Sequence, residues 1–332
     1  MTVLITGGSG FVGSWTTREL LSRGEQVVLY DLYPRTDLIY DLLDEVTLIK
    51  GDLLDFGNLA HALKSHNVDR VIHAASFLGF ESQARPPLAV KVNCEGTANV
   101  LEASRIMDVR RVVYTSTQSV YGITEPGLPV TEDDAPNPTT VYGATKRMCE
   151  WLGINYSTNY DMDFIAVRFP TVYGPTKLGR GWTVPLMDIV ENPVAGIPAV
   201  IATGGDVRQE LLYVKDAART VVNAAFVETT EHQIFNLGSS TAHTMHEMAE
   251  VVRNRIPGAE IEISDGPDPL YGLGGLLDLT RSSNEINHAI TYSLEEGIDD
   301  WIEFLKSRPQ REHPDPPTIS TDIPTTKQAR QR

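Results

Sequence analysis

The chain has 332 residues, of which 41% are hydrophobic, and carries a formal net charge of −16 at pH 7. This length suits one large α/β domain with a smaller lobe, and the acidic balance argues against nucleic-acid partners, which require a basic surface. The two cysteines, Cys94 and Cys149, are too few for a disulfide framework and lack metal-ligand spacing, so we expect a cytoplasmic protein without a metal site. We also expect no export signal and no membrane partner, because no apolar run is long enough to cross a bilayer.

Short apolar runs alternate with amphipathic stretches through the first half of the chain, which predicts a parallel sheet covered by helices on both faces. The expected strands are Val3–Thr6, Gln26–Asp31, Thr47–Lys50, Arg70–His73, Arg111–Ser116 and Phe164–Arg168. The expected helices are Val12–Arg23, Phe56–Ser65, Pro87–Met107 and Val141–Tyr160. We therefore predict an α/β fold whose doubly wound parallel Rossmann sheet forms a dinucleotide-binding domain over residues 1–170.

Repeated prolines interrupt this rhythm after the sixth expected strand, and we expect a smaller mixed C-terminal substrate lobe over residues 171–307. Further elements predict a return of the chain to the main sheet near residues 210–240. They are a strand near Glu210–Val214, a helix over Asp216–Val227 and a strand near Ile234–Leu237. The remaining residues, 308–332, are rich in Pro, Thr, Arg and Gln, so we expect a flexible tail.

Three glycines, Gly7, Gly10 and Gly13, follow the first expected strand and open the first expected helix. In a dinucleotide-binding loop the first glycine permits a tight turn, the second lets the backbone approach a pyrophosphate, and the third lets helix and strand pack closely. The amino end of the helix then stabilises the negative charge. An ordinary strand-to-helix turn is the alternative, but the context of strand, glycines and helix favours a dinucleotide site.

Asp31 ends the second expected strand, where a carboxylate can accept hydrogen bonds from the adenosine ribose and repel a 2′-phosphate. This favours NAD as the cofactor, although Arg35 nearby would suit the phosphate of NADP. Asp52 follows the third expected strand and is placed for the adenine edge. A turn residue is the alternative for Asp52, because Asp readily accepts backbone hydrogen bonds.

Thr117, Tyr142 and Lys146 are the candidate catalytic residues. Tyr142 and Lys146 are four apart in an expected helix, so they share one face and the ammonium can favour ionisation of the phenol. The hydroxyl of Thr117 would hold the substrate oxygen against Tyr142, and the three would transfer a proton in alcohol and ketone chemistry. The spacing of Tyr142 and Lys146 alone would also fit an ordinary helix surface. The catalytic interpretation is favoured because Thr117 and the glycine loop occur in the same chain.

These motifs resemble the extended short-chain dehydrogenase/reductases, specifically their NAD-dependent epimerase/dehydratase branch, from Val3 to about Leu305. The matching segments are Gly7–Gly13, Gly51–Leu53, His73–Ser76, Val92–Thr97, Tyr114–Gly122, Tyr142–Lys146 and Val167–Pro175. The resemblance implies that NAD contacts further residues, namely Phe11, Val12, Leu53, Ala74, Ala75, Asn93, Tyr142, Lys146 and Pro170. It also implies that Asn93 steadies the active-site backbone and that Lys146 holds the nicotinamide ribose.

The sequence departs from the sugar-nucleotide members of this branch at positions that bind the nucleotide diphosphate. Thr171 and Gln209 stand where those members have Asn and Arg, and the region Tyr271–Gly275 lacks their further Arg. A guanidinium donates two hydrogen bonds with full charge, which Gln or Thr does not replace. Compensating cations are available in Arg208, Arg180 and Lys177.

Two more features bear on the substrate. Gln118 and Ser119 stand where the sugar dehydratases of this branch have an acid pair, which argues against 4,6-dehydration as the reaction. We expect the substrate contacts to be Ser116, Thr117, Thr171 and Arg208.

We therefore predict an NAD-dependent oxidoreductase acting at a secondary alcohol or ketone of a polar, non-nucleotide small molecule, with sugar derivatives included. The main alternative is a nucleotide-sugar epimerase with tightly bound NAD, and an alternative of another class is a non-catalytic dinucleotide sensor. Met148, Trp151, Leu152 and Tyr156 form an apolar stripe on the Tyr142 helix. The stripe suits either the core of the subunit or the interface of a homodimer, which we expect from the resemblance.

Overall fold

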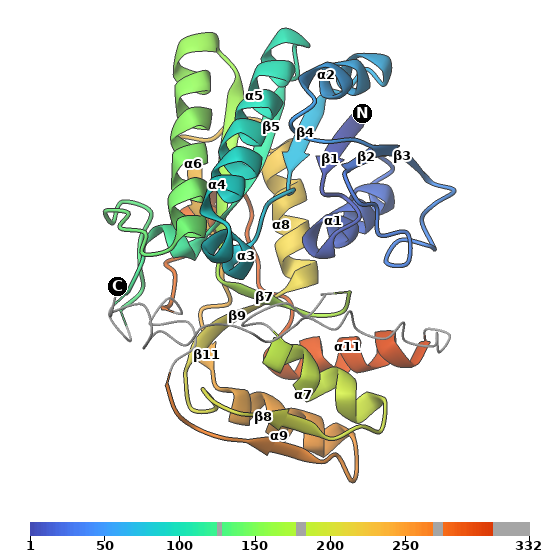
Figure 1. Cartoon of the computed structure of the whole chain (residues 1–332), viewed down its shortest axis with the longest axis vertical. Coiled ribbons are helices and arrows are strands. Elements are labelled where there is room, and N and C mark those ends of the chain that lie inside the picture. Colours follow the sequence, from blue (N-terminus) through green and yellow to red (C-terminus); the bar gives the residue numbers. More distant parts are fainter. Residues whose placement is uncertain (125–127, 177–183, 268–274, 308–332) are drawn as a thin grey trace, which may run out of the picture.

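The computed structural model describes residues 1–124, 128–176, 184–267 and 275–307 (Figure 1). In this part of the chain the main sheet has seven strands in the order β10-β6-β5-β4-β1-β2-β3, and each pairs in parallel with its neighbours. The strands are β1 (Thr2–Thr6), β2 (Gln26–Asp31), β3 (Val46–Lys50), β4 (Arg70–His73), β5 (Arg111–Thr117), β6 (Asp163–Phe169) and β10 (Ile234–Asn236). The predicted α/β fold with a doubly wound parallel sheet is confirmed.

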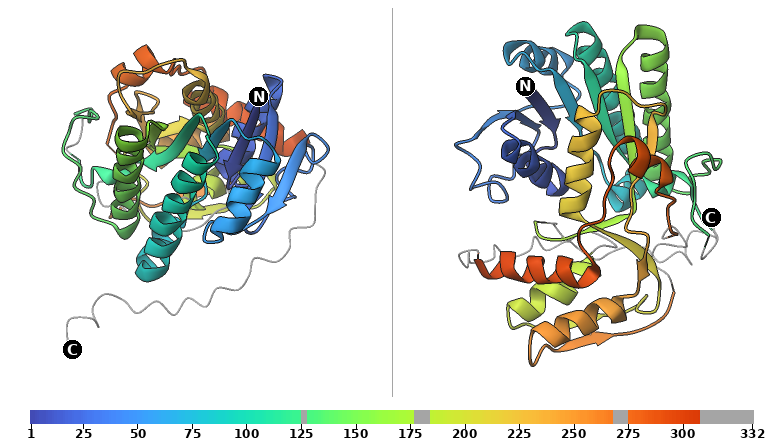
Figure 2. Two further views of the ribbon diagram at one scale, coloured as in Figure 1. Left: turned by 90° about the horizontal axis from the view of Figure 1, so that it is seen from above. Right: turned by 180° about the vertical axis from the view of Figure 1, so that it is seen from behind.

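Helices cover both faces of this sheet. One face packs against α1 (Phe11–Ser22) and α8 (Val214–Phe226), and the other packs against α2 (Phe56–Ser65), α5 (Gly96–Ile106) and α6 (Val141–Tyr160). Figure 2 shows the sheet from above, between the two helical layers. Every residue of β5 is buried, as expected for a central parallel strand that is covered on both sides.

Helix α6 has the predicted bounds because both of its ends carry strong local signals. The Thr140 hydroxyl accepts a hydrogen bond from the Gly143 N–H at 3.0 Å and caps the first turn. At the other end Asp161 adopts a left-handed conformation with φ of 55°, which stops the helix. The helix therefore starts one residue before Tyr142.

The segment predicted as one helix over Pro87–Met107 is divided in the structure. Two short helices, α3 (Gly79–Ala84) and α4 (Pro86–Ala89), lead into a π-helical turn, η1 (Val90–Glu95), which continues into α5. The prediction of a single regular helix was wrong, because the backbone forms a π-helical turn at the position where the Asn93 side chain bonds to Phe77 and Thr145. Such π turns often occur at functional sites.

The C-terminal lobe contains two small sheets in the described residues, in the orders β11-β9-β7 and β12-β8. Their strands are β7 (Thr171–Tyr173), β8 (Ala199–Ile201), β9 (Gln209–Tyr213), β11 (Ala242–His243) and β12 (Ile261–Ile263). The lobe helices are α7 (Val184–Val194), α9 (Met245–Arg255) and α11 (Leu294–Ser307), and they surround a core of their own, below the main sheet in Figure 1.

The chain returns to the main sheet later than the sequence predicts. Strand β9 belongs to the lobe, and only α8 and β10 join the main domain, followed by the short helix α10 (Thr280–Glu285). The sequence of β9 did not indicate which sheet the strand joins, because a buried strand has the same apolar pattern in either sheet. The tail predicted over residues 308–332 lies outside the described residues. No helix in the described part of the chain is long and apolar enough to cross a membrane.

Candidate active site

The loop between β1 and α1 has the shape of an anion-binding turn. Gly7 has a φ of +68°, and a Cβ there would lie 2.8 Å from the backbone of Ala75. A Cβ on Gly13 would lie 2.2 Å from the Gly7 carbonyl oxygen. Helix α1 starts after Gly10 without a side-chain cap, so its first N–H groups point their partial positive charge toward the loop.

The end of β4 lies directly against this loop. The Ala74 N–H donates to the Thr6 carbonyl at 3.1 Å, and the Ala75 N–H donates to the Thr6 hydroxyl at 3.3 Å. On the other side of the loop, Phe11 and Val12 pack against the core from the first turn of α1. These predicted cofactor residues therefore come together at the carboxyl edge of the sheet, where parallel α/β proteins bind ligands.

Asp31 holds the glycine loop through Ser9. One carboxylate oxygen accepts hydrogen bonds from the Ser9 N–H at 3.1 Å and the Ser9 hydroxyl at 2.6 Å. Arg35, the candidate for binding a 2′-phosphate, instead donates two hydrogen bonds to Asp37 at 2.9 and 2.6 Å. The carboxylate thus lies beside the loop, while the guanidinium is neutralised by its own neighbour.

We expect Asp31→Ala to weaken NAD binding by about tenfold to a hundredfold, because hydrogen bonds to a charged group contribute about 1.5–3 kcal/mol. NADP binding should weaken less, because the substitution also removes the electrostatic repulsion between the Asp31 carboxylate and the 2′-phosphate. Titration of both cofactors by fluorescence measures the ratio. As a control, Asp37→Ala releases Arg35 and should strengthen NADP only; tighter NADP than NAD binding by the unmodified protein would contradict the assignment.

Asp52 and Leu53 lie in the turn that follows β3. The Asp52 carboxylate accepts the Leu54 N–H at 3.0 Å, the bond expected of a turn residue, and the Asp52 carbonyl accepts the Tyr30 hydroxyl at 3.0 Å. Leu53 is buried, and its carbonyl accepts the Asn99 amide at 2.9 Å. Turn formation therefore explains the Asp52 carboxylate in this structure, and contact with the adenine stays a prediction.

The candidate catalytic residues meet where β5 ends and α6 begins. The Lys146 ammonium donates to the Thr115 carbonyl at 2.7 Å and lies 5.6 Å from the centroid of the Tyr142 ring. The first turn of α6 packs closely against the turn after Thr117, since a Cβ on Gly143 would lie 2.3 Å from a carbonyl oxygen there. The helix thereby brings Tyr142 and Lys146 to the end of the strand that carries Thr117.

Burial controls the protonation of this site. It lowers the pKa of the Lys146 ammonium to about 8. It raises the pKa of the Tyr142 phenol above its ordinary value, and a hydrogen bond with Ser76 only partly opposes this. Burial therefore favours the neutral phenol, which is the opposite of the lowered phenol pKa that the spacing of Tyr142 and Lys146 predicted.

The Thr117 hydroxyl lies at the start of η2, a single 3-10 turn (Gln118–Val120). It accepts the Ser119 N–H at 3.2 Å and lies 3.2 Å from the Ser119 hydroxyl. Both bonds fix the orientation of the Thr117 side chain. The turn thus presents a positioned hydroxyl at the carboxyl end of β5.

Asn93 joins the segment after β4 to the catalytic helix. Its side-chain oxygen accepts the Phe77 N–H at 2.7 Å, and its side-chain nitrogen donates to the Phe77 carbonyl and to the Thr145 hydroxyl, each at 3.0 Å. Thr145 directly precedes Lys146. The π turn therefore points Asn93 inward, where it fixes the backbone on both sides of the site.

Comparison with known proteins identifies the family. The model of the NAD dependent epimerase/dehydratase family matches residues 3–238. This chain belongs to that family. A UDP-glucose 4-epimerase of Mycolicibacterium smegmatis is 30% identical over 93% of this chain and 100% of its own length. The structure of the Thermus thermophilus UDP-glucose 4-epimerase in complex with NAD has a TM-score of 0.82 and 26% identity, over 92% of this chain and 99% of the other.

A third similar protein is MoeE5 in complex with UDP-glucuronic acid and NAD, with a TM-score of 0.79 and 28% identity over 92% of this chain and 99% of the other. The family consists of enzymes that use NAD, so this chain is an NAD-dependent enzyme, and the alternative of a non-catalytic sensor is set aside. The glycine loop fits this cofactor, because Gly13 leaves no room for a side chain and α1 has an uncapped amino end for the pyrophosphate. Bound NAD supplies hydride uptake and return.

Sequence reasoning missed a buried ion pair between α6 and β6, close to the candidate catalytic residues. Arg168 on β6 donates to both carboxylate oxygens of Glu150 on α6 at 2.8 Å, and both residues are 0% exposed. Ser116 donates to the same carboxylate at 2.6 Å. Burial raises the pKa of Glu150, but the hydrogen bonds and charge of Arg168 outweigh it and hold the pKa below its ordinary value.

This arrangement corrects the expectation that Ser116 contacts substrate, because its hydroxyl is directed into the buried pair and the residue is only 3% exposed. Neighbouring residues of a strand point to opposite faces, so Ser116 and Thr117 differ in role. The signal available in the sequence was Arg168, a charged residue that lies between the apolar run of residues 164–167 and Phe169.

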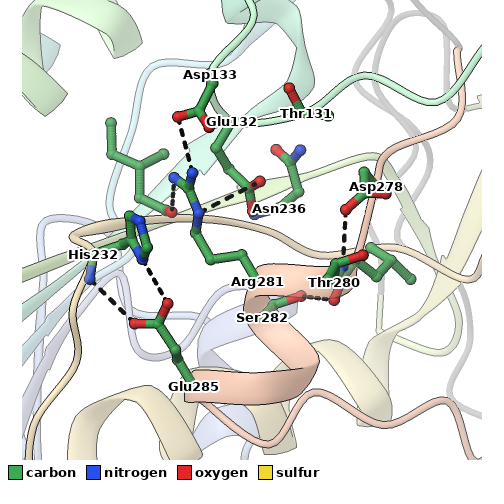
Figure 3. A network of polar contacts seen from close by, with 12 residues as sticks. Thr131, Glu132, Asp133, His232, Asn236, Asp278, Thr280, Arg281, Ser282 and Glu285 are labelled. Carbon is green, nitrogen blue, oxygen red and sulfur yellow. Dashed lines mark hydrogen bonds and ion pairs between the residues drawn. The ribbon is translucent and has the colours of Figure 1, made fainter.

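The buried pair continues as a polar network into the C-terminal part of the chain. Arg168 donates to the Tyr121 hydroxyl, which donates to the Asn236 side chain, each at 2.7 Å. The Asn236 N–H donates to Glu132 at 2.7 Å (Figure 3). Arg281 on α10 donates to Asp133 at 2.8 Å, as Figure 3 shows, so α10 is tied to the loop that precedes α6.

The substrate side differs from the expectation for Arg208. Its guanidinium pairs with Glu247 at 2.6 Å and donates to the Ala242 carbonyl at 2.8 Å, with 61% of the side chain exposed. Gln209 is buried in β9, and Thr171 is half-buried at the start of β7, directly after the buried Pro170. The other candidate cations, Lys177 and Arg180, lie outside the described residues, as does most of the region Tyr271–Gly275.

Proposed function

We propose that this enzyme is an NAD-dependent epimerase of a nucleotide sugar. The observation that carries the proposal is the 30% identity, over nearly the full length of both chains, to a UDP-glucose 4-epimerase. Lys146 lies near Tyr142 and reaches the end of β5, which carries Thr117, and the glycine loop follows β1 at the same edge of the sheet. This arrangement supports NAD-dependent proton and hydride transfer. The comparisons thus favour the nucleotide-sugar alternative over the non-nucleotide substrate that the sequence suggested.

In this proposal the side chains move one proton while the reacting carbon exchanges a hydride with NAD. Thr117 and Tyr142 hold the substrate oxygen. Tyr142 acts here as its phenolate: it takes the proton from the alcohol oxygen as the hydride leaves the carbon, and it gives that proton back when the hydride returns. Lys146 places positive charge near the phenol and stabilises its ionised form while the proton is away. Return of the hydride to the opposite face inverts the carbon, whereas release of NADH would leave a net oxidation.

One observation favours the second candidate, a smaller substrate without a nucleotide. Gln209 is uncharged, and Arg208 is paired with Glu247. Replacing an Arg fork by an amide loses hydrogen bonds to a charged group, worth about 1.5–3 kcal/mol each. Two such losses without compensation would weaken a nucleotide ligand by at least about a hundredfold.

Calorimetry of the NAD-loaded protein separates the two candidates. If the enzyme is a nucleotide-sugar epimerase, UDP, GDP or dTDP should bind with micromolar affinity, because residues other than Gln209 supply the diphosphate contacts. The same titration of Arg208→Ala tests whether the Arg208 guanidinium leaves Glu247 and binds the diphosphate: if it does, the variant binds the nucleotides more weakly than the wild type. Millimolar binding by all three nucleotides, together with turnover of a smaller hydroxy compound, would favour the second candidate.

We also propose that the enzyme is a homodimer through the outer face of α6. Met148 and Trp151 are 50% and 52% exposed, whereas Leu152 and Tyr156 of the same predicted stripe pack against the core of the subunit. Large exposed apolar side chains on one helix face favour contact with another protein surface. Light scattering tests this proposal: a molar mass near 36.6 kDa, the mass of one chain, would contradict it.

A further inference from the structure

Gln118 has an unusual environment for an amide side chain. It follows Thr117 directly and begins η2, at the carboxyl end of β5. The residue is only 8% exposed. Its side-chain oxygen is buried and has no hydrogen-bond partner in the described part of the chain.

Buried polar atoms are nearly always paired, because an unpaired acceptor loses its hydration without compensation. Among the described residues, two other buried side-chain atoms also lack a partner, the Ser104 hydroxyl and the Trp301 indole nitrogen. Ser104 lies on α5 and Trp301 lies in the core of the lobe, both away from the catalytic residues. Gln118 is the one adjacent to Thr117, at the edge of the sheet where ligands bind.

The turn that carries Gln118 is held by a backbone hydrogen bond and by packing of a neighbouring residue. The Gln118 carbonyl accepts the Tyr121 N–H at 2.9 Å, and Val120 packs with Leu277 in a small apolar cluster. A rigid backbone holds the amide near one position, which reduces the entropy lost on binding. An amide does not titrate near neutral pH, so its oxygen accepts a hydrogen bond without exchanging a proton.

We propose that Gln118 is a substrate-binding residue whose side-chain oxygen accepts a hydrogen bond from a hydroxyl or amide N–H on a carbon close to the one that exchanges the hydride. Thr117 and Tyr142 hold the reacting oxygen, and Gln118 recognises its neighbour. The substrate class is therefore a sugar with a hydrogen-bond donor beside the reacting centre. This inference rests on the proposed function, which supplies the sugar substrate. Gln118 would then select among sugars by the group on the neighbouring carbon.

The test compares the wild type with Gln118→Met, which has similar size but no acceptor. The probes are a UDP-hexose and its deoxy analogues, each lacking one hydroxyl of the sugar ring, and the readouts are kcat/KM and calorimetric affinity in the NAD-loaded enzyme. The wild type should reject one deoxy analogue by at least about tenfold, because a site built to bond a hydroxyl discriminates strongly against its absence. Gln118→Met should lose about tenfold or more toward the full sugar and show no such discrimination.

A purely structural role predicts a different pattern. Removing an unpaired buried acceptor should leave the melting temperature unchanged or raise it, so lost selectivity in a variant at least as stable as the wild type supports a role in binding. Ser104→Ala removes a second unpaired atom and should change neither affinity nor selectivity. Equal discrimination by the wild type and Gln118→Met would overturn the inference. Failure of the proposed function has another signature, in which the wild type neither binds nor converts any UDP-hexose, and that result would remove both proposals.

Discussion

Tyr142→Phe should lower turnover by about 10²–10⁴-fold, the range that general acid and base catalysis contributes. Tyr142 lies at the start of α6, and in the proposed reaction its phenolate takes the proton of the substrate alcohol and then gives it back. The phenylalanine ring fills the same space. NAD binding, which depends on the glycine loop and Asp31, should change little.

Steady-state kinetics and a fluorescence titration with NAD measure these two quantities in the same preparation. Tyr156→Phe is a matched control on the same helix, since the Tyr156 hydroxyl donates to Glu102 at 3.1 Å. It should keep the activity of the wild type. More than about a tenth of wild-type activity in Tyr142→Phe would contradict the assigned role.

Glu150→Ala should lower the free energy of unfolding by about 3–5 kcal/mol, because it leaves the fully buried Arg168 guanidinium without its counter-ion. Urea denaturation measures this loss. The pKa of Glu150 is held below its ordinary value in the fold, so the stabilisation is present above an ordinary glutamate pKa of about 4.3 and is lost as the pH falls through the lowered native value.

Glu102→Ala provides the matched control for a surface pair. Glu102 and Arg105 form an ion pair with side chains that are 34% and 36% exposed. Pairs of this kind contribute about 0–1 kcal/mol. Equal losses in the two variants would show that burial does not strengthen the role of Glu150.

Local patterns were sufficient to predict the glycine loop and the bounds of α6. Gly7 is required by its own positive φ, and Gly13 by the close approach of the Gly7 carbonyl oxygen in the same turn. Helix α6 has the predicted bounds because its cap and its left-handed end are local features. The spacing of Tyr142 and Lys146 then places both on one face of that helix.

Features that depend on distant parts of the chain were not predictable from the sequence. Glu150 and Arg168 are 18 residues apart and pair only when α6 packs on β6. The π turn contains Asn93, whose side chain forms hydrogen bonds with Phe77 on one side and Thr145 on the other, both distant in the sequence. Desolvation is equally non-local, so the spacing of Tyr142 and Lys146 alone suggested the wrong direction for the phenol pKa.

The reaction that we propose for this enzyme is epimerisation of a nucleotide sugar, with NAD retained by the enzyme. The most direct measurement is to incubate the purified protein with UDP-glucose and related UDP-hexoses, and to follow the sugar by NMR and NADH by absorbance in one sample. We predict that an epimer inverted at one carbon accumulates to equilibrium without net NADH release, and that Tyr142→Phe abolishes its formation. Accumulation of NADH in step with a released keto product, or no conversion of any UDP-hexose while a smaller alcohol is oxidised, would contradict the account.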